Sequence, residues 1–530
     1  MTPTIEEQQL REHLVVEEIT FAIPAQSFAI SCAISAEEAL PVVTEFALRI
    51  AYVCGTLSPA QIQDFFGFSK KETDAVLKSL LDERLLQWND EHLELTTYAL
   101  ARFQDSSDNL PRFFKIQDWS TEVVFDLISF SPAERPSRLK RVRSQIELAT
   151  RNLDKQSRTR QYAEQSFQQN FRQICTKDKA EIYKISAIDA GERFSIPLSC
   201  TFHLDLGGQT SIRRNIDDES FGSRLEISEA ITDALASQER GDNERLRDFI
   251  QTFDDTLLQR YVTGDAFDLR RYAQEVHLTR IVRPDDDRVT PMLGALYLPR
   301  NAGLLLERIQ AAMAQLDARF ELEPPSTESA ESDTEEAAET THPAQREALW
   351  WAPQSPLWAR TRSARDLAQK IERLLVPQGG ERPSTGLQVV VPTARRSRER
   401  LAVYQDQFSR LLAADVVLMD GSLELLLVPD ALVCAMFHFN LAHNATAVPI
   451  GFMSSAPEHI ASAGALVSAR MRGRSDSVTA AREEGGAALI DGLAQLVARL
   501  TPPREVDADG STKGGRARLT LKKSRENAGS

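Results

Sequence analysis

Cysteines are few in this sequence, and the short motifs of the commonest catalytic and metal sites are missing from it. The five cysteines lie far apart and form no Cys-x-x-Cys pair, which argues against a disulfide framework and against a structural zinc site. The chain has no GxxxxGKS or GxxxxGKT sequence, no GxSxG and no HExxH, so it lacks the P-loop, hydrolase and zincin motifs. We therefore expect neither a cofactor nor a metal.

Long apolar runs are missing too. The most apolar stretch, residues 39–54, is broken by Glu45 and Arg49 and is too short to span a bilayer. The N-terminus, MTPTIEEQQLREH, is polar and acidic, unlike a secretory signal. We expect a cytoplasmic protein without a membrane partner. At 530 residues, with 42% hydrophobic and 26% charged residues, the chain is ordinary in composition and long enough for several domains.

The chain is acidic overall, but one segment is strongly basic. The net charge is −15, yet residues 135–179 hold twelve Lys/Arg and only four acids, which leaves +8. Such local asymmetry is typical of an anion-facing surface. We expect residues 134–175 to form a long basic helix that contacts phosphate backbone; the alternative is the solvated face of a connecting helix. The basic residues are Arg135, Arg138, Lys140, Arg141, Arg143, Arg151, Lys155, Arg158, Arg160, Arg172, Lys177 and Lys179.

Residues 56–103 contain two helix starts in close succession. Ser58-Pro59-Ala60-Gln61 and Ser69-Lys70-Lys71-Glu72 are both capping boxes, and Gly67-Phe68 ends the first short helix between them. Leu85–Trp88 and His92–Thr96 are expected to form a β-hairpin, with further helices at 37–54 and 97–104. This order resembles a winged helix-turn-helix, a fold that implies one helix placed in a groove of DNA.

The second of these helices has a mixed charge pattern. Its exposed lysines, Lys70, Lys71 and Lys78, are candidate DNA contacts. The same helix also presents acids, Glu72, Asp74, Asp82 and Glu83, whereas a strong DNA reader usually has a cleaner basic face. A protein-binding role for this region therefore stays open.

The segment Val389–Ser455 resembles the second half of a phospholipase D-like domain. A strand ends in a proline, a helix and strands follow, and a later strand carries His438. Active members of that family use a His-x-Lys-x4-Asp motif, which implies a nucleophile or acid at His438. Asn440 and Ala445 occupy the lysine and aspartate positions, while Gly451 and Ser454 only approximate the downstream Gly-Ser pattern. The resemblance implies a fold whose phosphodiesterase activity is lost; alternatively, His438 is an ordinary half-buried strand histidine.

Arginines open the helix that is expected from Thr393 through Leu412, and a helix N-terminus with arginines can bind an anion. A solvated helix face is the alternative. The candidate nucleic-acid contacts at this helix are Arg395, Arg396 and Arg398.

The complete pattern predicts an α+β multidomain protein, with a winged-helix N-terminal region, a central mixed β and helical region, and a C-terminal α/β domain. Residues 14–34 are expected to be two strands broken at Pro24. Glutamates, Ser, Thr and Pro dominate residues 321–346, which cannot bury enough apolar surface to fold. The expected segments are a β plus winged-helix domain at 1–130, a basic helical connector at 131–180, a mixed β then helical region at 181–320, an acidic disordered linker at 321–346, an α/β phospholipase D-like domain at 347–500 and a disordered basic tail at 501–530.

Three functional hypotheses follow from these features. The leading one is a non-enzymatic DNA-binding accessory or adaptor subunit that holds duplex backbone and binds other protein subunits. By analogy alone, such a protein fits a bacterial multi-gene system such as phage defence. The second is a phosphodiesterase or nuclease that uses His438. The third is a protein-interaction scaffold without DNA contact.

Overall fold

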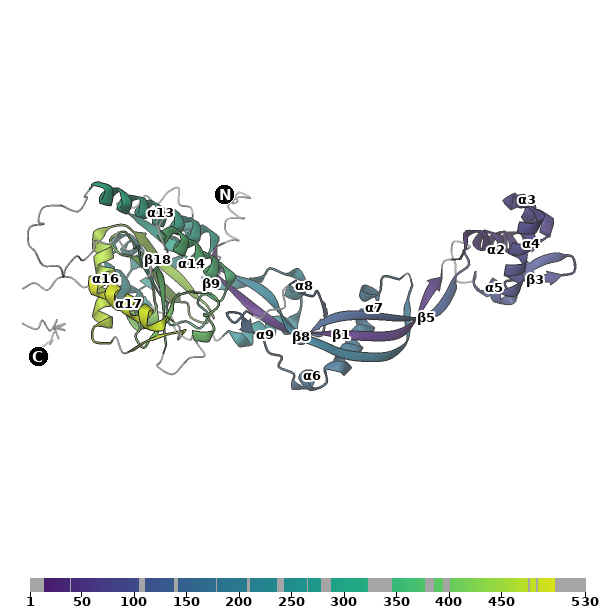
Figure 1. Ribbon diagram of the computed structural model, residues 1–530, viewed down its shortest axis with the longest axis horizontal. Helices are drawn as coiled ribbons and strands as arrows, with labels where there is room; N and C mark the ends of the chain where they lie inside the picture. Colours follow the sequence, from purple (N-terminus) through teal and green to yellow (C-terminus); the bar gives the residue numbers. More distant parts are fainter. Residues whose placement is uncertain are drawn as a thin grey trace, which may run out of the picture. The chain divides into compact units, whose positions relative to one another are not determined.

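The protein has a mixed α and β architecture with several sheets, seen here in a computed structural model (Figure 1). Its residues divide into two compact units. The N-terminal unit comprises 19–201 and 214–236, and the C-terminal unit comprises 1–18, 202–213 and 237–530. The structure describes residues 14–38, 40–103, 110–137, 142–177, 179–206, 210–235, 243–264, 266–277, 287–322, 346–376, 386–393, 401–474, 477–482 and 485–500.

A long antiparallel pairing organises the N-terminal unit. Strand β1 (Val15–Glu38) pairs with β5 (Phe113–Asp126) from Ala25↔Asp126 to Glu38↔Phe113. The sheet order is β6-β5-β1-β8-β9, and β7 also pairs with β1. The boundary between the two units falls within β1 and β8, so each unit is assembled from segments distant in sequence. The other strands of this sheet are β6 (Pro132–Ala133), β7 (Ile146–Glu147), β8 (Glu181–Asp205) and β9 (Ser211–Ile216).

The expected break at Pro24 is wrong, because β1 continues through this proline. Pro24 lies one residue beyond Ala25, where the pairing with β5 ends. Its missing N–H therefore removes no bond from that ladder. Its carbonyl still accepts a hydrogen bond from the backbone N–H of Leu127.

The long basic helix expected at 134–175 is shorter in the structure. Only α6 (Leu153–Ser157) and α7 (Thr159–Ile174) are helical, and residues 138–141 lie outside the described part. Upstream, Ile146 and Glu147 pair with β1, and the backbone N–H of Leu148 bonds to Ala22. Burial of Leu148 and this β-pairing override the local helical preference. The segment 131–180 is therefore a mixture of strand and helix.

Helix α7 is held against the sheet by one apolar face. Its Phe167 and Phe171 pack in a cluster with Cys32, Trp119 and Phe125 of the strands. The opposite face is polar and exposed. The position of α7 brings the basic residues at its C-terminus to the sheet. The N-terminal unit also contains α8 (Glu219–Gly222) and α9 (Leu225–Ala234).

Residues 42–101 form a small helical subdomain with a three-stranded sheet in the order β2-β4-β3. Both expected capping boxes are confirmed, at Ser58 with Gln61 and at Ser69 with Glu72. Gly67 ends the first of these helices with a left-handed φ of 68°, which suits glycine. The elements are α2 (Val42–Cys54), β2 (Thr56–Leu57), α3 (Pro59–Phe66), α4 (Lys70–Asp82), β3 (Leu86–Asn89), β4 (His92–Leu95) and α5 (Thr97–Ala101).

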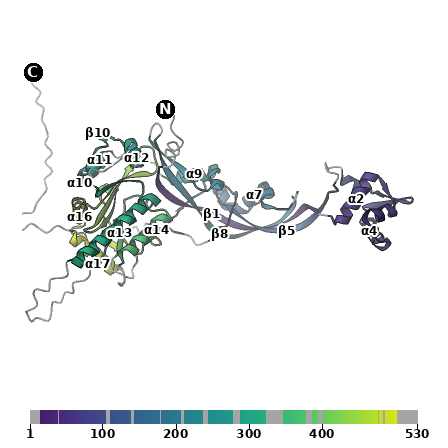
Figure 2. The same cartoon turned by 90° about the horizontal axis from the view of Figure 1, so that it is seen from above.

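An eight-stranded sheet forms the core of the C-terminal unit, in the order β12-β18-β17-β16-β13-β14-β15-β19. Figure 2 shows the helices that surround it. The central β13, β14 and β15 are parallel, and the flanking strands are antiparallel. The strands are β12 (Val289–Leu293), β13 (Ala348–Trp351), β14 (Leu387–Pro392), β15 (Leu411–Ala414), β16 (Leu423–Val428), β17 (Leu432–Asn440), β18 (Ala447–Ser454) and β19 (Val478–Ala480).

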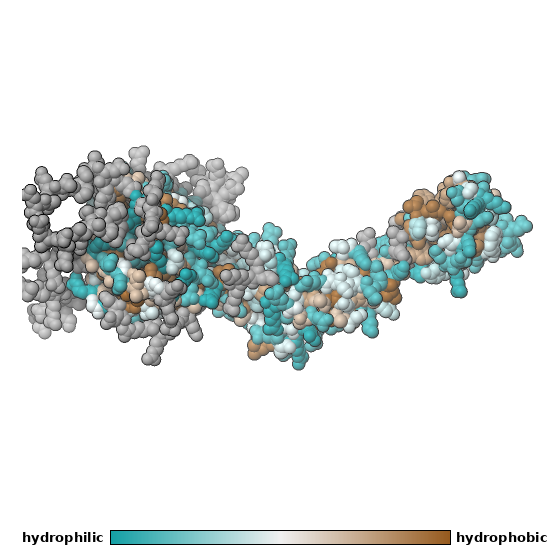
Figure 3. Space-filling view, viewed as in Figure 1, coloured by the Kyte–Doolittle hydropathy of each residue, from teal (hydrophilic) through white to brown (hydrophobic). Residues whose placement is uncertain are grey.

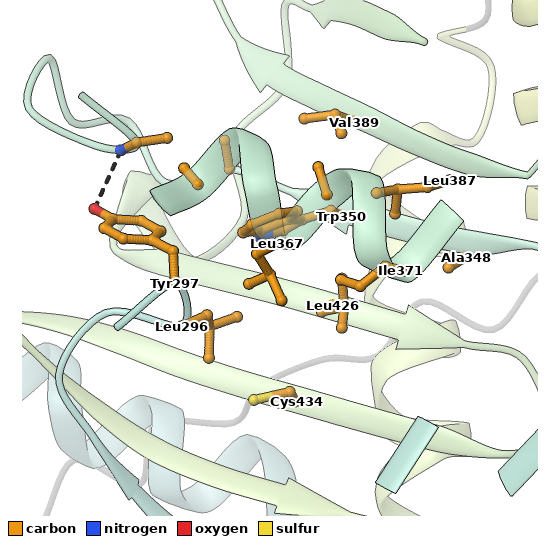
Figure 4. Packing of buried hydrophobic residues seen from close by; sticks show 14 of the residues in the cluster. Leu296, Tyr297, Ala348, Trp350, Leu367, Ile371, Leu387, Val389, Leu426 and Cys434 are labelled. Atoms are coloured by element: carbon orange, nitrogen blue, oxygen red, sulfur yellow. Dashed lines mark hydrogen bonds between the residues drawn. The ribbon is translucent and has the colours of Figure 1, made fainter. Parts of the chain in front are cut away.

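Helices cover both faces of this sheet, so most residues of its strands are buried and apolar. On one face, α14 packs Leu367 and Ile371 against Trp350, Leu387 and Val389, as Figure 4 shows. On the other, rings of α10 contact rings of β17 and β18. The helices and smaller elements are α10 (Asn243–Phe253), α11 (Thr256–Gln259), β10 (Val262–Thr263), β11 (Ala266–Phe267), α12 (Leu269–His277), α13 (Pro299–Leu322), α14 (Arg362–Leu375), η1 (Met419–Gly421), α16 (Pro457–Met471) and α17 (Gly486–Arg499).

Three segments predicted for the C-terminal half lie wholly or partly outside the described residues. Strand β15 occupies the end of the helix expected from Thr393 through Leu412, so that helix is wrong at its C-terminus; residues 394–400 lie outside the described part. Nearly all of the linker at 321–346 and the whole tail at 501–530 also lie outside it.

Candidate nucleic-acid interface

The lysines of α4 are exposed, as the sequence suggested. Lys70, Lys71 and Lys78 have no ion pair among the described residues. Lys78 borders a groove of ≈ 300 Å³ together with two acids of the same helix, Asp74 and Asp82. These acids offset the positive charge of Lys78, so the surface of α4 alone would bind an anion weakly.

Several cations of the basic stretch are already neutralised within the N-terminal unit. Arg135 pairs with Glu122 at 3.1 Å and with Glu192 at 3.2 Å. Arg151 pairs with Asp233 at 2.5 Å and with a further carboxylate of α9. These two arginines hold elements of the unit together, so the sequence count of +8 overstates the charge available to a ligand.

The remaining basic residues of this stretch surround a cavity. Arg172 in the last turn of α7, and Lys177 and Lys179 beyond it, line a space of ≈ 930 Å³. Arg172 and Lys177 are exposed and have no ion pair among the described residues, whereas Lys179 is held at 2.9 Å by Glu37 of β1. The lining contains Ser35, Phe114, Arg172, Cys175, Thr176, Lys177, Lys179, Ala180 and Glu181. Lys179 is balanced by Glu37, so among the described lining residues Arg172 and Lys177 stand against one acid, Glu181, and the cavity favours an anionic ligand.

The structure brings only part of the predicted site together. Arg143 is exposed between β6 and β7, and neither it nor the α4 lysines line the cavity. Part of the cavity wall comes from β1 and β5 and includes Phe114. The sequence did not predict this part, because these strands contact α7 only through long-range packing. Six predicted contacts lie outside the described residues: Arg138, Lys140, Arg141, Arg395, Arg396 and Arg398.

Helix α2 exposes apolar side chains at helical spacing. Val42, Phe46 and Val53 are 69%, 41% and 76% exposed. Figure 3 shows apolar surface over the small helical subdomain. Exposed apolar patches commonly mark protein contacts. This face is consistent with a protein partner and does not resemble a phosphate-binding surface.

His438 is part of a buried polar cluster in the C-terminal unit. Its Nε2 lies 2.7 Å from Oε2 of Glu424 on β16. The indole N–H groups of Trp350 and Trp358 both donate to Oε1 of Glu424 at 2.9 Å. Glu424 is fully buried, and the His438 side chain is 7% exposed. A nucleophile must touch the reacting phosphorus, whereas this histidine nitrogen faces an internal carboxylate.

Gly451 and Ser454, the approximate Gly-Ser pattern, have structural contacts. A Cβ on Gly451 would lie 1.9 Å from the carbonyl oxygen of Ala435 on the neighbouring strand, so only glycine fits there. The hydroxyl of Ser454 accepts from the backbone N–H of Ala456 at 3.0 Å and lies 2.9 Å from Nδ1 of His459. These contacts fix strand packing and the start of α16.

A second buried carboxyl lies close to the same cluster. The Tyr297 hydroxyl donates to Glu17 at 2.5 Å. It also accepts from the backbone N–H of Ala359, the dashed line in Figure 4. Burial raises the pKa of Glu17 to about 8, although the Tyr297 hydrogen bond opposes the shift. Glu17 is therefore protonated in the folded protein near neutral pH.

This shift predicts a pH-dependent stability. Between the ordinary pKa of 4.5 and about 8, the folded chain holds a proton that the unfolded chain has lost. Stability contributed by Glu17 is therefore present below about pH 4.5 and falls as pH rises, by up to about 1.4 kcal/mol per pH unit. Urea denaturation across this window should show the fall, and Glu17→Gln should reduce it.

The exposed carboxylate of Glu458 provides the control, since Glu458→Gln should leave the slope unchanged. An identical slope in wild type and Glu17→Gln would contradict the assignment. The comparison is made at constant ionic strength, because exposed ion pairs such as Arg288–Glu458 respond to salt.

The described residues contain no group of three or more His, Cys, Asp or Glu side chains that could hold a metal ion. None of the described helices combines the length and apolar character that a membrane span needs. Comparisons of the chain with models of protein families, with curated proteins and with solved structures found no match.

Proposed function

We propose that this protein is a non-enzymatic DNA-binding accessory subunit that holds the phosphate backbone without reading sequence. The cavity lined by Arg172, Lys177 and Lys179 carries this proposal. It gathers cations from a helix end and the following segment, inside a protein whose net charge is −15. Phosphate contacts of this kind supply affinity and position without sequence information. The exposed Lys70 and Lys71 of α4 offer further contacts in the same unit.

The surroundings of His438 support a role without catalysis. Asn440 and Ala445 replace the lysine and aspartate of the phospholipase D-like motif. The histidine itself is buried against Glu424, which also accepts two indole hydrogen bonds. Such a cluster stabilises a core and leaves no cation of the motif for a phosphate. The C-terminal unit, on this proposal, serves binding to a partner.

A scaffold role in a multi-protein system is the second candidate. The observation that favours it is the apolar exposed face of α2, with Val42, Phe46 and Val53. Surfaces of this kind lower their free energy by packing against another protein. An adaptor would combine both properties, with α2 for a protein and the cavity for DNA.

Neutralising Arg172 and Lys177, the two cavity cations without an ion pair in the described part of the chain, should weaken DNA binding. The substrate is a duplex with a single-stranded tail, titrated in a mobility-shift assay at several salt concentrations. Arg172→Gln/Lys177→Gln is expected to lose about tenfold or more at low salt. The slope of log K against log salt should fall by about 1.4 to 1.8, because two phosphate contacts are removed.

The matched control neutralises cations that are already paired. Arg135→Gln and Arg151→Gln each remove one arginine held by carboxylates, so affinity should change little. If the control weakens binding as much as the cavity variant, only net charge matters and the site is wrong. If wild type does not bind, or the cavity variant binds equally well, the DNA-binding proposal fails.

A further inference from the structure

An aromatic ring forms part of the wall of the cationic cavity. Phe114 of β5 is 44% exposed. It lines the same cavity as Arg172 and Lys177. The partly exposed ring is therefore accessible to a ligand that enters the cavity. A ring beside unpaired cations is the combination that proteins use to bind single strands, in which cations follow the backbone and rings stack on bases.

The dimensions of the cavity point the same way. A space of ≈ 930 Å³ falls in the range of small-molecule pockets, about 300–1,000 Å³. The bases of a duplex are stacked on one another and paired, so their faces cannot reach a ring inside such a cavity. Bases in a single strand can be splayed out and stacked on aromatic side chains.

We propose that this cavity binds a single-stranded segment of nucleic acid, with a base against Phe114 and phosphates against Arg172 and Lys177. The hydroxyl groups of Ser35 and Thr176 also line the space and can donate to phosphate or sugar oxygens. Lys179 is oriented by its 2.9 Å contact with Glu37. This inference rests on the proposed function and specifies the form of nucleic acid that the cavity takes.

The test measures how the ring of Phe114 contributes to nucleic-acid binding by the full chain. A fluorescently labelled oligothymidylate, the matching oligouridylate and a blunt duplex are titrated by anisotropy. Phe114→Ala should weaken binding of the single strands by about tenfold, the effect of losing one stacked base. Phe114→Tyr keeps the ring and should bind as wild type. Ile116→Ala, an exposed apolar residue of the same strand that does not line the cavity, is the control.

The outcomes separate this inference from the function on which it rests. Loss of single-strand binding in Phe114→Ala with unchanged duplex binding supports the inference; the two oligonucleotides then show whether DNA or RNA is preferred. Unchanged single-strand binding in Phe114→Ala, or equal losses for duplex and single strand, overturns it. The DNA-binding proposal would still stand if Arg172→Gln/Lys177→Gln weakened binding of the tailed duplex.

Discussion

Replacing Asp126 with alanine is expected to destabilise the N-terminal unit by about 3–5 kcal/mol, the usual cost of breaking a buried ion pair. The carboxylate is fully buried and accepts from Arg224 at 2.8 Å. It also accepts from the backbone N–H groups of Ile128 at 3.0 Å, Ser129 at 2.6 Å and Ser131 at 3.1 Å. Removing it leaves all of these donors without their acceptor, and the N–H of Ile128 and the Arg224 guanidinium are largely shielded from water.

Glu122 provides a control on the same strand. Its pair with Arg135 is exposed on both sides, so Glu122→Ala should cost less than about 1 kcal/mol. Asp126→Asn keeps one acceptor oxygen and should fall between the two. Urea denaturation of the full chain measures the difference. A loss of stability below about 1 kcal/mol for Asp126→Ala would show that the segment 128–131 does not depend on this carboxylate.

Replacing Glu424 with alanine should have an effect of similar size in the C-terminal unit, about 3–5 kcal/mol. Three side chains form hydrogen bonds with this carboxylate: the indole N–H groups of Trp350 and Trp358, and the His438 ring. All lie in the core under α14, where unpaired polar groups are costly. The change also leaves a cavity between large rings.

Two further variants help to separate the loss of the hydrogen bonds of Glu424 from the effect of the void that its removal leaves. His438→Leu should cost less than Glu424→Ala, because Glu424 keeps both indole donors. Glu458→Ala removes an exposed carboxylate paired with Arg288 at 3.3 Å and should change stability by less than about 1 kcal/mol. Chemical denaturation gives the values. Equal losses for Glu424→Ala and Glu458→Ala would mean that the buried cluster contributes nothing specific.

The result for His438 also bears on the rival enzymatic hypothesis. A structural histidine can be replaced at the cost of stability alone, whereas a nucleophile is essential for turnover. If any phosphodiesterase activity of the purified chain disappears in His438→Leu while folding is retained, the non-enzymatic proposal fails. Burial against Glu424 makes the structural role the better supported one.

Much of the local structure could be predicted because its causes are local. The capping boxes at Ser58 and Ser69 use bonds between residues three positions apart, so the sequence alone shows them. The same holds for the strand of residues 387–391, whose apolar run indicates burial on both faces. The concentration of basic residues before position 180 is likewise visible without a structure.

Errors arose where distant residues decide the conformation. Residues 146–147 have helical neighbours in sequence but pair with β1. Pro24 looks like a strand break, yet it lies where one ladder has already ended. Arg135 and Arg151 look like ligand-binding cations, but each pairs with a carboxylate far along the chain, Glu192 and Asp233 respectively. Propensity is a weak preference, and tertiary pairing outweighs it.

The sequence by itself determined the helix starts at Ser58 and Ser69, the buried character of the C-terminal strands and the sign of charge in each segment, because these depend on side-chain chemistry and on spacings of a few residues. Only the tertiary structure decided which cations remain free and what lies beside them. Arg172 and Lys177 come close to Phe114 because α7 buries Phe167 and Phe171 against the sheet that contains β5. That packing joins segments that lie far apart in the sequence, and no local pattern encodes it.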